Sequence, residues 1–492
     1  MALPFPDSSP PSAPFRRARL FAWLTAGFVL LVPIVNFAAF SRLFWFGDEL
    51  DLIDQIDHIG LWRWVWLPFA ENFVPLFKLG FGGLIFAGHG SYLFLLVTIW
   101  LVHAVNVGVL VGWLLELGVH AAGAVMAGLI FGLSGSNLET LTWPVQSSAV
   151  LATLFFLLAA RTVIRTGPDA ISPRRVGGVI AAGAASALAF SRGVLTGPVV
   201  AALWLDPTLA SSESTGRRVR TAALWCLPSV AIGLLIYHLA PSSHRSVFSD
   251  ADQLRQAAGF ATWFFCLNPI VSYFSISPLN WGIPAVGWTS VVVVGAVKIG
   301  FIGLGFACGT SRQRRMLAAL LLLDLFSAFL LGYGRGESDL SHALSSRYQY
   351  NSLLCFAPFL AVVIGRGWQS LARLDREVAR DLRARFPAQS FIRRPEVGGH
   401  LSSDLSSQLS GRGGLPRRFA AVLLGTCLCL LPIGYAYGKW RLLLPPWAEW
   451  RGQSTRRLLF ETKPLPSGND LVGIPFLPNA RAKELADKYH LH

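Results

Sequence analysis

Long apolar segments recur along the whole chain, and short polar segments that carry most of the charge separate them. Several of them reach the roughly 17–25 residues that a helix needs to cross a bilayer. A consistent set of spans is residues 19–40, 91–116, 120–136, 142–162, 175–191, 193–207, 221–240, 284–308, 316–333, 349–366 and 418–438. The pattern predicts an all-α protein, a polytopic transmembrane helical bundle of about 11 spans.

One further segment, residues 258–278, is apolar enough to span the membrane. Its aromatic residues, Asn268 and two prolines suit a helix that lies in or dips into the outer membrane interface. A twelfth crossing would place the basic cluster around Arg312 outside the cell. We favour the interfacial interpretation, and a twelfth span is the alternative.

Arginine clusters between the spans indicate the orientation. Arg16, Arg17 and Arg19 precede the first span without a small-residue cleavage site, so we expect an uncleaved anchor. The other clusters are Arg161, Arg165, Arg174 and Arg175; Arg217, Arg218 and Arg220; Arg312, Arg314 and Arg315; and the Arg/Ser/Gly-rich segment 367–417, which holds Arg373, Arg376, Arg380, Arg383 and Arg385. All of these should face the cytoplasm.

This orientation divides the chain into five parts. We expect a cytoplasmic N-terminus (1–18) and a membrane domain (19–366) whose first outer loop is 41–75. A cytoplasmic loop (367–417), a last span (418–438) and a short extracytoplasmic tail (439–492) follow. The protein should therefore be a multi-pass integral membrane protein.

The composition supports a membrane protein and indicates which classes of partner to expect. Charged residues make up 14% of the chain, against about 25% in soluble domains. The net charge of +15 lies in clusters between spans, so we expect the lipid bilayer as a partner and no nucleic acid. The six cysteines lie mostly in apolar runs, and Cys427 and Cys429 form C-x-C instead of a metal-binding C-x-x-C.

The densest negative charge follows the first span. The stretch FGDELDLIDQID, residues 46–57, holds Asp48, Glu49, Asp51, Asp54 and Asp57. As a helix it places its aspartates on one half and most of its aliphatic residues on the other, which predicts an interfacial helix with a wet acidic face. A solvated face of this kind explains why Asp54 and Asp57 are charged. It does not explain Asp48 and Glu49, which lie at the membrane end, where desolvating a charge is costly.

Isolated polar residues lie at outer ends of other spans or within them. They are His103 and Asn106 on one helix face; Glu139 in an outer turn; Arg192 at the next outer junction; and Arg347, Tyr348 and Tyr350 where the chain re-enters the membrane. Each has a structural alternative: hydrogen bonds across helices, capping of a turn, or an arginine reaching the headgroups.

Taken together, acids and cations from separate outer turns would converge on one outward-facing cavity. In such a cavity a carboxylate can accept a proton from an acceptor hydroxyl. A guanidinium can bind a phosphate through two hydrogen bonds and stabilise it as it departs. This combination fits transfer of a group from a lipid phosphate to a nucleophile.

Several segments, in order, resemble a known family. They are GDE (47–49), ENFVPLFKL (71–79), GHGSYLFLLVTIWLVHAVNVGVL (88–110), GLSGSNLETLTWPVQSSAVLATLFFLLA (132–159), SRGVLTGP (191–198) and SRYQY (346–350). In this order and spacing the chain resembles the GT-C glycosyltransferases, and within them the protein O-mannosyltransferase-like group. The resemblance implies a GT-C fold with an interfacial first outer loop, in a bacterial inner membrane, with the active site facing outside.

The resemblance also implies roles for individual residues. Asp48 matches the catalytic Asp of the first outer loop, and its neighbour Glu49 is expected to help bind the acceptor or to hold Asp48 in place. Arg192 and Arg347 match basic groups that bind the donor phosphate. Further substrate contacts are expected from His103, Glu139, Tyr348 and Tyr350. The implied reaction is inverting transfer from a polyprenyl-phosphate-linked sugar to an extracytoplasmic acceptor, with no cofactor and no metal.

The chain departs from the group at three places. Phe73 and Val74 precede the Pro-Leu, Ser134 and Gly135 replace a His-Pro, and Gly193 stands where a Glu commonly follows a Lys. The resemblance therefore does not name the sugar or the acceptor. Two other classes stay open, a transporter or flippase of a lipid-linked saccharide and a noncatalytic scaffold. A transporter often shows internal repeats, and the sequence contains no convincing repeat.

Overall fold

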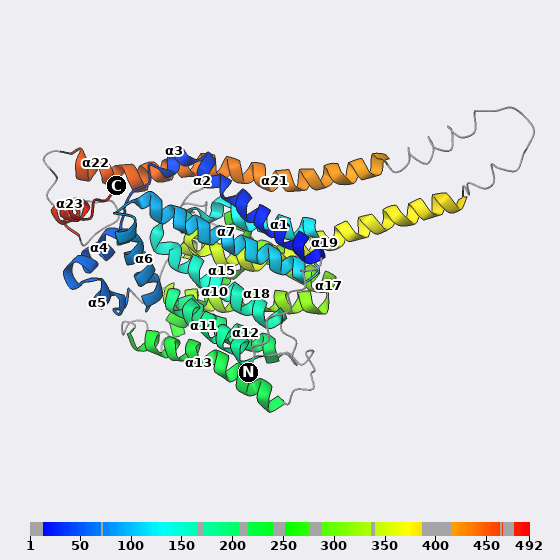
Figure 1. The fold of residues 1–492 in the computed structure, drawn as a ribbon, viewed down its shortest axis with the longest axis horizontal. Coiled ribbons are helices and arrows are strands. Elements are labelled where there is room, and N and C mark those ends of the chain that lie inside the picture. The colour runs from blue at the N-terminus through cyan, green and yellow to red at the C-terminus, as the bar shows by residue number, and fades with distance from the viewer. Residues whose placement is uncertain are drawn as a thin grey trace, which may run out of the picture.

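The computed structural model describes residues 13–69, 72–165, 172–205, 215–239, 251–275, 287–335, 340–385, 415–462, 465 and 477–492. All regular secondary structure in these ranges is helical (Figure 1). The α-helices are α1 (Ala13–Val29), α2 (Leu31–Val35), α3 (Phe37–Phe40), α4 (Asp48–Ile59), α5 (Leu61–Val65), α6 (Pro75–Ala87), α7 (Tyr92–Glu116), α8 (Ala121–Leu133), α9 (Leu138–Thr142), α10 (Ser147–Arg165), α11 (Pro173–Ala189), α12 (Thr196–Leu205), α13 (Thr215–Leu239), α15 (Ala251–Leu267), α16 (Ile270–Phe274), α17 (Trp288–Cys308), α18 (Ser311–Arg335), α19 (Ser346–Arg385), α21 (Leu415–Ala448), α22 (Ser454–Phe460) and α23 (Asn479–Lys488).

Eight helical segments of the described chain are long and apolar enough to cross a membrane. They are Ala18–Val35, Tyr92–Glu116, Ala121–Thr142, Pro144–Arg165, Thr215–Leu239, Trp288–Cys308, Ser311–Arg335 and Ser346–Ser370. The predicted all-α, multi-pass membrane class is therefore confirmed. The other three predicted spans correspond to α11, α12 and part of α21, and the count of 11 stays a prediction.

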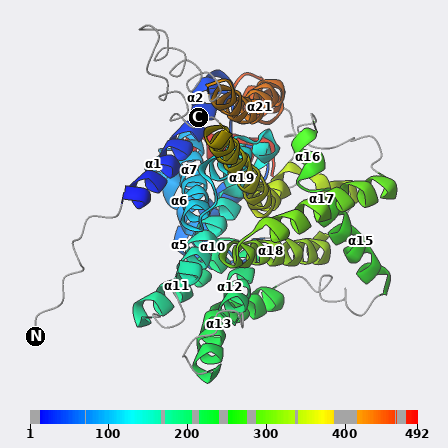
Figure 2. The same ribbon diagram turned by 90° about the vertical axis from the view of Figure 1, so that its right-hand side faces the viewer.

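The centre of the bundle is formed by α7, α8, α10 and α19, which pack against one another. Trp100 and Trp113 of α7 and Phe131 of α8 are fully buried there. Figure 2 shows α13 and α15 at the outer edge. On the periphery large apolar side chains are exposed, such as Leu227 of α13 and Val292 of α17, as expected for surfaces that contact lipid.

Local signals in the sequence mark where several helices begin. The Ser91 hydroxyl accepts a hydrogen bond from the Phe94 N–H at 3.4 Å and so caps the start of α7. Pro75 and Pro173 stand at the first positions of α6 and α11, where a missing N–H costs nothing. Ser172 caps α11 in the same manner as Ser91 caps α7.

The segment 258–278, whose role the sequence left open, forms parts of two helices. α15 packs against α17 and α18, and Pro269 follows its end, so α16 starts in a new direction. Asn268 between them is fully buried, and its side-chain N–H donates to the Ala343 carbonyl at 2.8 Å. The segment thus belongs to the bundle, and its last residues, 276–278, lie outside the described ranges.

The region 367–417 is helical at its start because α19 continues to Arg385. Residues 386–414 of this expected cytoplasmic loop lie outside the described residues.

The described parts of the expected tail, 439–462, 465 and 477–492, return to the helix α4 of the expected outer loop. α21 continues to Ala448, and α22 and α23 bring the chain back beside α4, where the C-terminus lies (Figure 1). The Tyr92 N–H donates to the His492 carbonyl at 3.0 Å, and the Gln453 side chain donates to the Arg42 carbonyl at 2.8 Å. This segment is therefore part of the folded domain.

This packing corrects the predicted wet acidic face of α4. Arg481 lies 2.7 Å from the carboxylates of both Asp54 and Asp57, and Lys488 lies 2.5 Å from Asp57. Only 9% of the Asp57 side chain is exposed. Hydrogen bonds from Lys488 and Arg481 hold the pKa of Asp57 well below its usual range. These two acids, which we expected to be solvated, dock α23 through ion pairs.

Replacing Arg481 with Gln removes the cation that Asp54 and Asp57 share. A partly exposed ion pair contributes about 1 kcal/mol or less, so we expect amide hydrogen exchange in residues 479–492 to rise by up to about fivefold. Because folding lowers the pKa of Asp57, the contribution of this carboxylate is complete above the usual aspartate pKa and is lost as the pH falls from there through the lowered pKa. Hydrogen-exchange mass spectrometry measures the effect. Asp487→Asn, which removes an ion pair inside α23, is the control, and equal acceleration in both variants would contradict the docking role.

Candidate functional site

A cavity of about 480 Å³ lies beside the start of α4. Its walls come from segments far apart in the sequence. They include the loop around Asn72, the turn before α10, the 3-10 turn Ser191–Leu195, and α13, α18 and α19. Four sequence-predicted residues line it: Asp48, Arg192, Arg347 and Tyr348.

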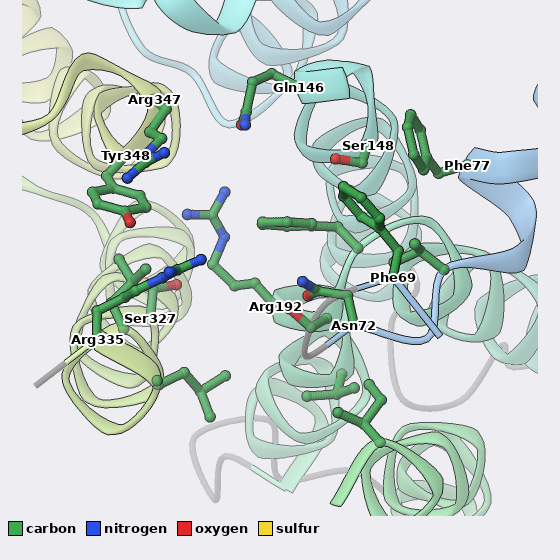
Figure 3. Close-up of a pocket in the computed structure, with 18 of the residues that line it drawn as sticks. Phe69, Asn72, Phe77, Gln146, Ser148, Arg192, Ser327, Arg335, Arg347 and Tyr348 are labelled. Atoms are coloured by element: carbon green, nitrogen blue, oxygen red, sulfur yellow. The ribbon is translucent and has the colours of Figure 1, made fainter. Parts of the chain in front are cut away.

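The cavity is rich in guanidinium groups. Arg192, Arg335 and Arg347 come from three different elements, and Figure 3 shows their side chains pointing into the same space. Gln146 points toward this space from the opposite wall. Asp48 is the one acid among the described lining residues, so the lining carries two positive charges in excess. Such a site favours an anionic ligand.

Asp48 is the first residue of α4 and follows Gly47, whose φ of 59° favours glycine. Its side chain is open to the cavity, although protein surrounds it on the other sides. Burial raises the pKa of the Asp48 carboxyl, and the positive charges of Arg451, Arg347 and Arg335 oppose that rise. A carboxylate with a raised pKa is a stronger base than an exposed aspartate.

Glu49, the neighbour of Asp48, is fully buried and does not line the cavity. It accepts a hydrogen bond from the Phe46 N–H at 3.0 Å, and the Tyr92 hydroxyl lies 3.3 Å from its other oxygen. Burial raises the pKa of Glu49 well above its usual value. Its contacts fix the start of α4 and thereby the position of Asp48, and its side chain lies outside the cavity lining.

The position of Arg192 depends on a close turn between α11 and α12. Gly193 follows it, and a Cβ there would lie 1.9 Å from the Ser186 carbonyl oxygen, so only glycine fits. The Ser186 hydroxyl in turn donates to the Ala152 carbonyl and accepts from Thr196 at 2.9 Å. This turn holds Arg192 over the cavity.

Glu139 lies behind the cavity. It is buried, and one of its oxygens accepts hydrogen bonds from the Arg347 N–H at 3.1 Å and from the hydroxyls of Ser345 and Ser346. A carboxylate at a helix N-terminus is favourable, and this one fixes the first turn of α19. Glu139, predicted to bind substrate, therefore contacts the backbone that carries Arg347.

Arg451 completes this arrangement, and sequence reasoning did not include it. It lies 3.6 Å from the second oxygen of Glu139. Its guanidinium also lies 4.3–5.3 Å from the ring centroids of Phe46, Trp143, Trp447 and Trp450. Burial lowers the pKa of Arg451. The aromatic run around Trp447 and Trp450 was the available signal, since such rings favour a cation.

Arg335 was also missed. It is the last residue of α18 and lines the cavity opposite Arg192 (Figure 3). An arginine at the outer end of an apolar span was the only signal, and it is equally typical of headgroup contacts.

His103 and Tyr350, predicted as substrate contacts, do not line the cavity. Both are fully buried, and His103 Nδ1 lies 2.9 Å from the Tyr350 hydroxyl. Asn106 donates to the same hydroxyl at 2.9 Å, and His103 Nε2 lies 3.0 Å from the Gly132 carbonyl. All of these contacts join α7, α8 and α19. The structure thus agrees with the interhelical alternative for these residues.

Metal-binding residues do not gather in the described parts of the chain, where no group of three or more His, Cys, Asp or Glu side chains could hold an ion. Apolar residues of α13 and α18, among them Ile236 and Leu330, form another part of the cavity wall. The site therefore joins an arginine-rich, one-carboxylate region to an apolar wall.

No protein-family model matches the chain, and no curated protein sequence matches it. The functional argument therefore depends on the cavity itself.

Replacing Gly193 with Ala tests how the turn positions Arg192. The added Cβ would meet the backbone of Ser186, so we expect a loss of stability of the several-kcal/mol size typical of strained glycine replacements, and a lower Tm. Gly183→Ala in the preceding helix α11 is the control, because its Cβ would meet no atom within 4 Å and alanine favours helix. Equal Tm values for the two variants in detergent would contradict the assignment.

Proposed function

We propose that the protein is an inverting membrane glycosyltransferase of the GT-C type. It would move a hexose or pentose from a polyprenyl-phosphate carrier to a hydroxyl of an extracytoplasmic glycan, lipid or protein. The observation that carries this proposal is the lining of one cavity by Asp48 and by Arg192, Arg335 and Arg347. The arginine clusters at the other ends of the spans support an active site at the outer face of a bacterial inner membrane.

The donor's parts correspond to parts of the cavity. The three guanidinium groups suit the phosphate, because each can form paired hydrogen bonds with its oxygens. The apolar side formed by α13 and α18 suits the first isoprene units of the carrier. The sugar would then lie between the arginines and Asp48.

In the proposed reaction the acceptor hydroxyl loses its proton to the Asp48 carboxylate. The acceptor oxygen bonds to the anomeric carbon as the bond from that carbon to the phosphate oxygen breaks, and the electron pair stays on the phosphate. The carrier phosphate thus gains one negative charge, which the surplus positive charge of the lining stabilises. A single displacement of this kind inverts the anomeric configuration.

Asp48→Asn keeps the shape of the side chain and removes the proton acceptor. We expect transfer by the purified protein to fall by about 10²–10⁴-fold while binding of the polyprenyl-phosphate sugar is retained. Transfer is measured with a radiolabelled donor, and binding with the same donor in nanodiscs.

Asp51→Asn is the matched control. Asp51 lies one turn further along α4, bonds to Gln55 at 2.7 Å and does not line the cavity. Near-normal transfer by Asp48→Asn, or an equal loss in both variants, would sink the assignment. A transporter of lipid-linked saccharides would bind and move the donor without cleaving it, and wild-type protein would then release no carrier phosphate.

The pH dependence of transfer gives an independent test. Since the base acts as a carboxylate, kcat/KM should fall as the pH drops through the pKa of Asp48, which burial raises above its usual value. Arg451→Gln removes the positive charge that most opposes the rise in the Asp48 pKa. The pKa of Asp48 should therefore rise further, and the fall of kcat/KM at acidic pH (the acidic limb) should begin at a higher pH.

The control for this shift is Arg457→Gln. Arg457 pairs with Glu449 at the surface, so its loss should leave the acidic limb in place. An acidic limb that stays unmoved in Arg451→Gln would contradict the role of Asp48 as the base.

A further inference from the structure

A second cavity, of about 340 Å³, lies between α1, α7 and α10. Its polar lining consists of Arg19 on α1, Glu116 on α7, and Arg161 and Arg165 on α10. None of these residues lines the Asp48 cavity. The two cavities are therefore separate sites.

The second cavity lies at the opposite membrane surface. α7 begins at Tyr92, which contacts Glu49 beside the first cavity, and ends 25 residues later at Glu116. At about 1.5 Å per residue this helix is about 36 Å long, which exceeds the roughly 30 Å of a hydrocarbon core. Glu116 and its partners thus lie at headgroup level on the other side.

The charges of this cavity are arranged around one carboxylate. Glu116 accepts hydrogen bonds from Arg161 Nε at 3.0 Å and from Arg165 Nε at 2.6 Å. Glu116 is 11% exposed, whereas Arg165 is 45% exposed and lies toward the mouth. Arg19 lines the same cavity, so the lining holds three arginines and one glutamate and has a net charge of +2.

Two glycines give this site its room. Gly108 and Gly112 of α7 line the cavity, and a Cβ on Gly112 would lie 3.4 Å from Arg161 Nη2. The space in front of this guanidinium therefore depends on the missing side chains. Trp23 of α1 also lines the cavity and is 64% exposed, as is typical of tryptophan at a membrane interface.

We propose that this cavity binds the phosphate headgroup of an anionic phospholipid from the leaflet opposite the Asp48 cavity. An arginine guanidinium can form two parallel hydrogen bonds with the oxygens of one phosphate. Basic pockets between membrane helices suit anionic headgroups. A zwitterionic headgroup brings no net charge to match the two surplus positive charges. The bound lipid would join α1, which Figure 1 shows beside α7, to the rest of the bundle.

Native mass spectrometry of the full chain in detergent tests this site. The protein is titrated with phosphatidylglycerol or with phosphatidylcholine of the same acyl chains. We expect phosphatidylglycerol to bind at least about tenfold more tightly. Equal affinity for the two lipids would overturn the proposal.

A double variant, Arg19→Gln with Arg165→Gln, lowers the net charge of the lining by two and leaves the Arg161–Glu116 pair in place. It should lose the preference for phosphatidylglycerol. The matched control is Arg174→Gln with Arg220→Gln, which removes two exposed arginines of α11 and α13 outside the cavity. Equal loss in both double variants would mean that general surface charge attracts the lipid, and would overturn the site.

Two further measurements on wild-type protein keep the test independent of variant folding. Glycerol phosphate in excess should not displace phosphatidylglycerol; displacement would identify a soluble phosphate as the ligand and overturn the lipid assignment. A photoreactive phosphatidylglycerol should crosslink to peptides of α1, α7 or α10 around this cavity. Crosslinks confined to other helices would overturn the proposal.

Discussion

The Glu139 carboxylate joins the parts of the site. One oxygen accepts three hydrogen bonds from the start of α19, and the other faces Arg451. A buried carboxylate is costly unless it is paired and hydrogen-bonded, so these partners and Glu139 stabilise one another. Through these contacts the short helix α9, which carries Glu139, is held to the first turn of α19 and to the segment after α21. The side chains of Arg347 and Asp48 lie beside this buried network and line the cavity.

Two adjacent acids have opposite environments because a helix turns about 100° per residue. Asp48 is open to the cavity, and Glu49 points into the core toward Tyr92. The first is suited to exchange protons with a substrate, and the second to fix the backbone. Neighbouring acids of one helix can in this way have different roles, one in proton transfer and the other in fixing the backbone.

Hydropathy predicted the membrane class and most helix positions, because a span is a local property of some twenty residues. That Asp48, Arg192 and Arg347 would line one cavity also followed from their expected places in outer turns. Contacts made by residues 439–492 were not predictable in this way. Arg481 contacts Asp54, which lies 427 positions earlier in the chain. A local hydrophobic pattern does not indicate a partner at such a distance in the sequence. Helical spacing placed His103 and Asn106 on one face, but only packing shows that this face meets Tyr350 and not a substrate.

The return of the segment after α21 to α4 has a consequence for biogenesis. A ribosome makes the helices around the cavity long before it makes Arg451, Arg481 and Lys488. Until those residues reach the same side of the membrane as α4, Glu139 lacks its cation and α4 lacks its docking partner. Assembly of the site is thus delayed until after insertion of the bundle, which keeps a half-made chain in the translocon from presenting a finished site.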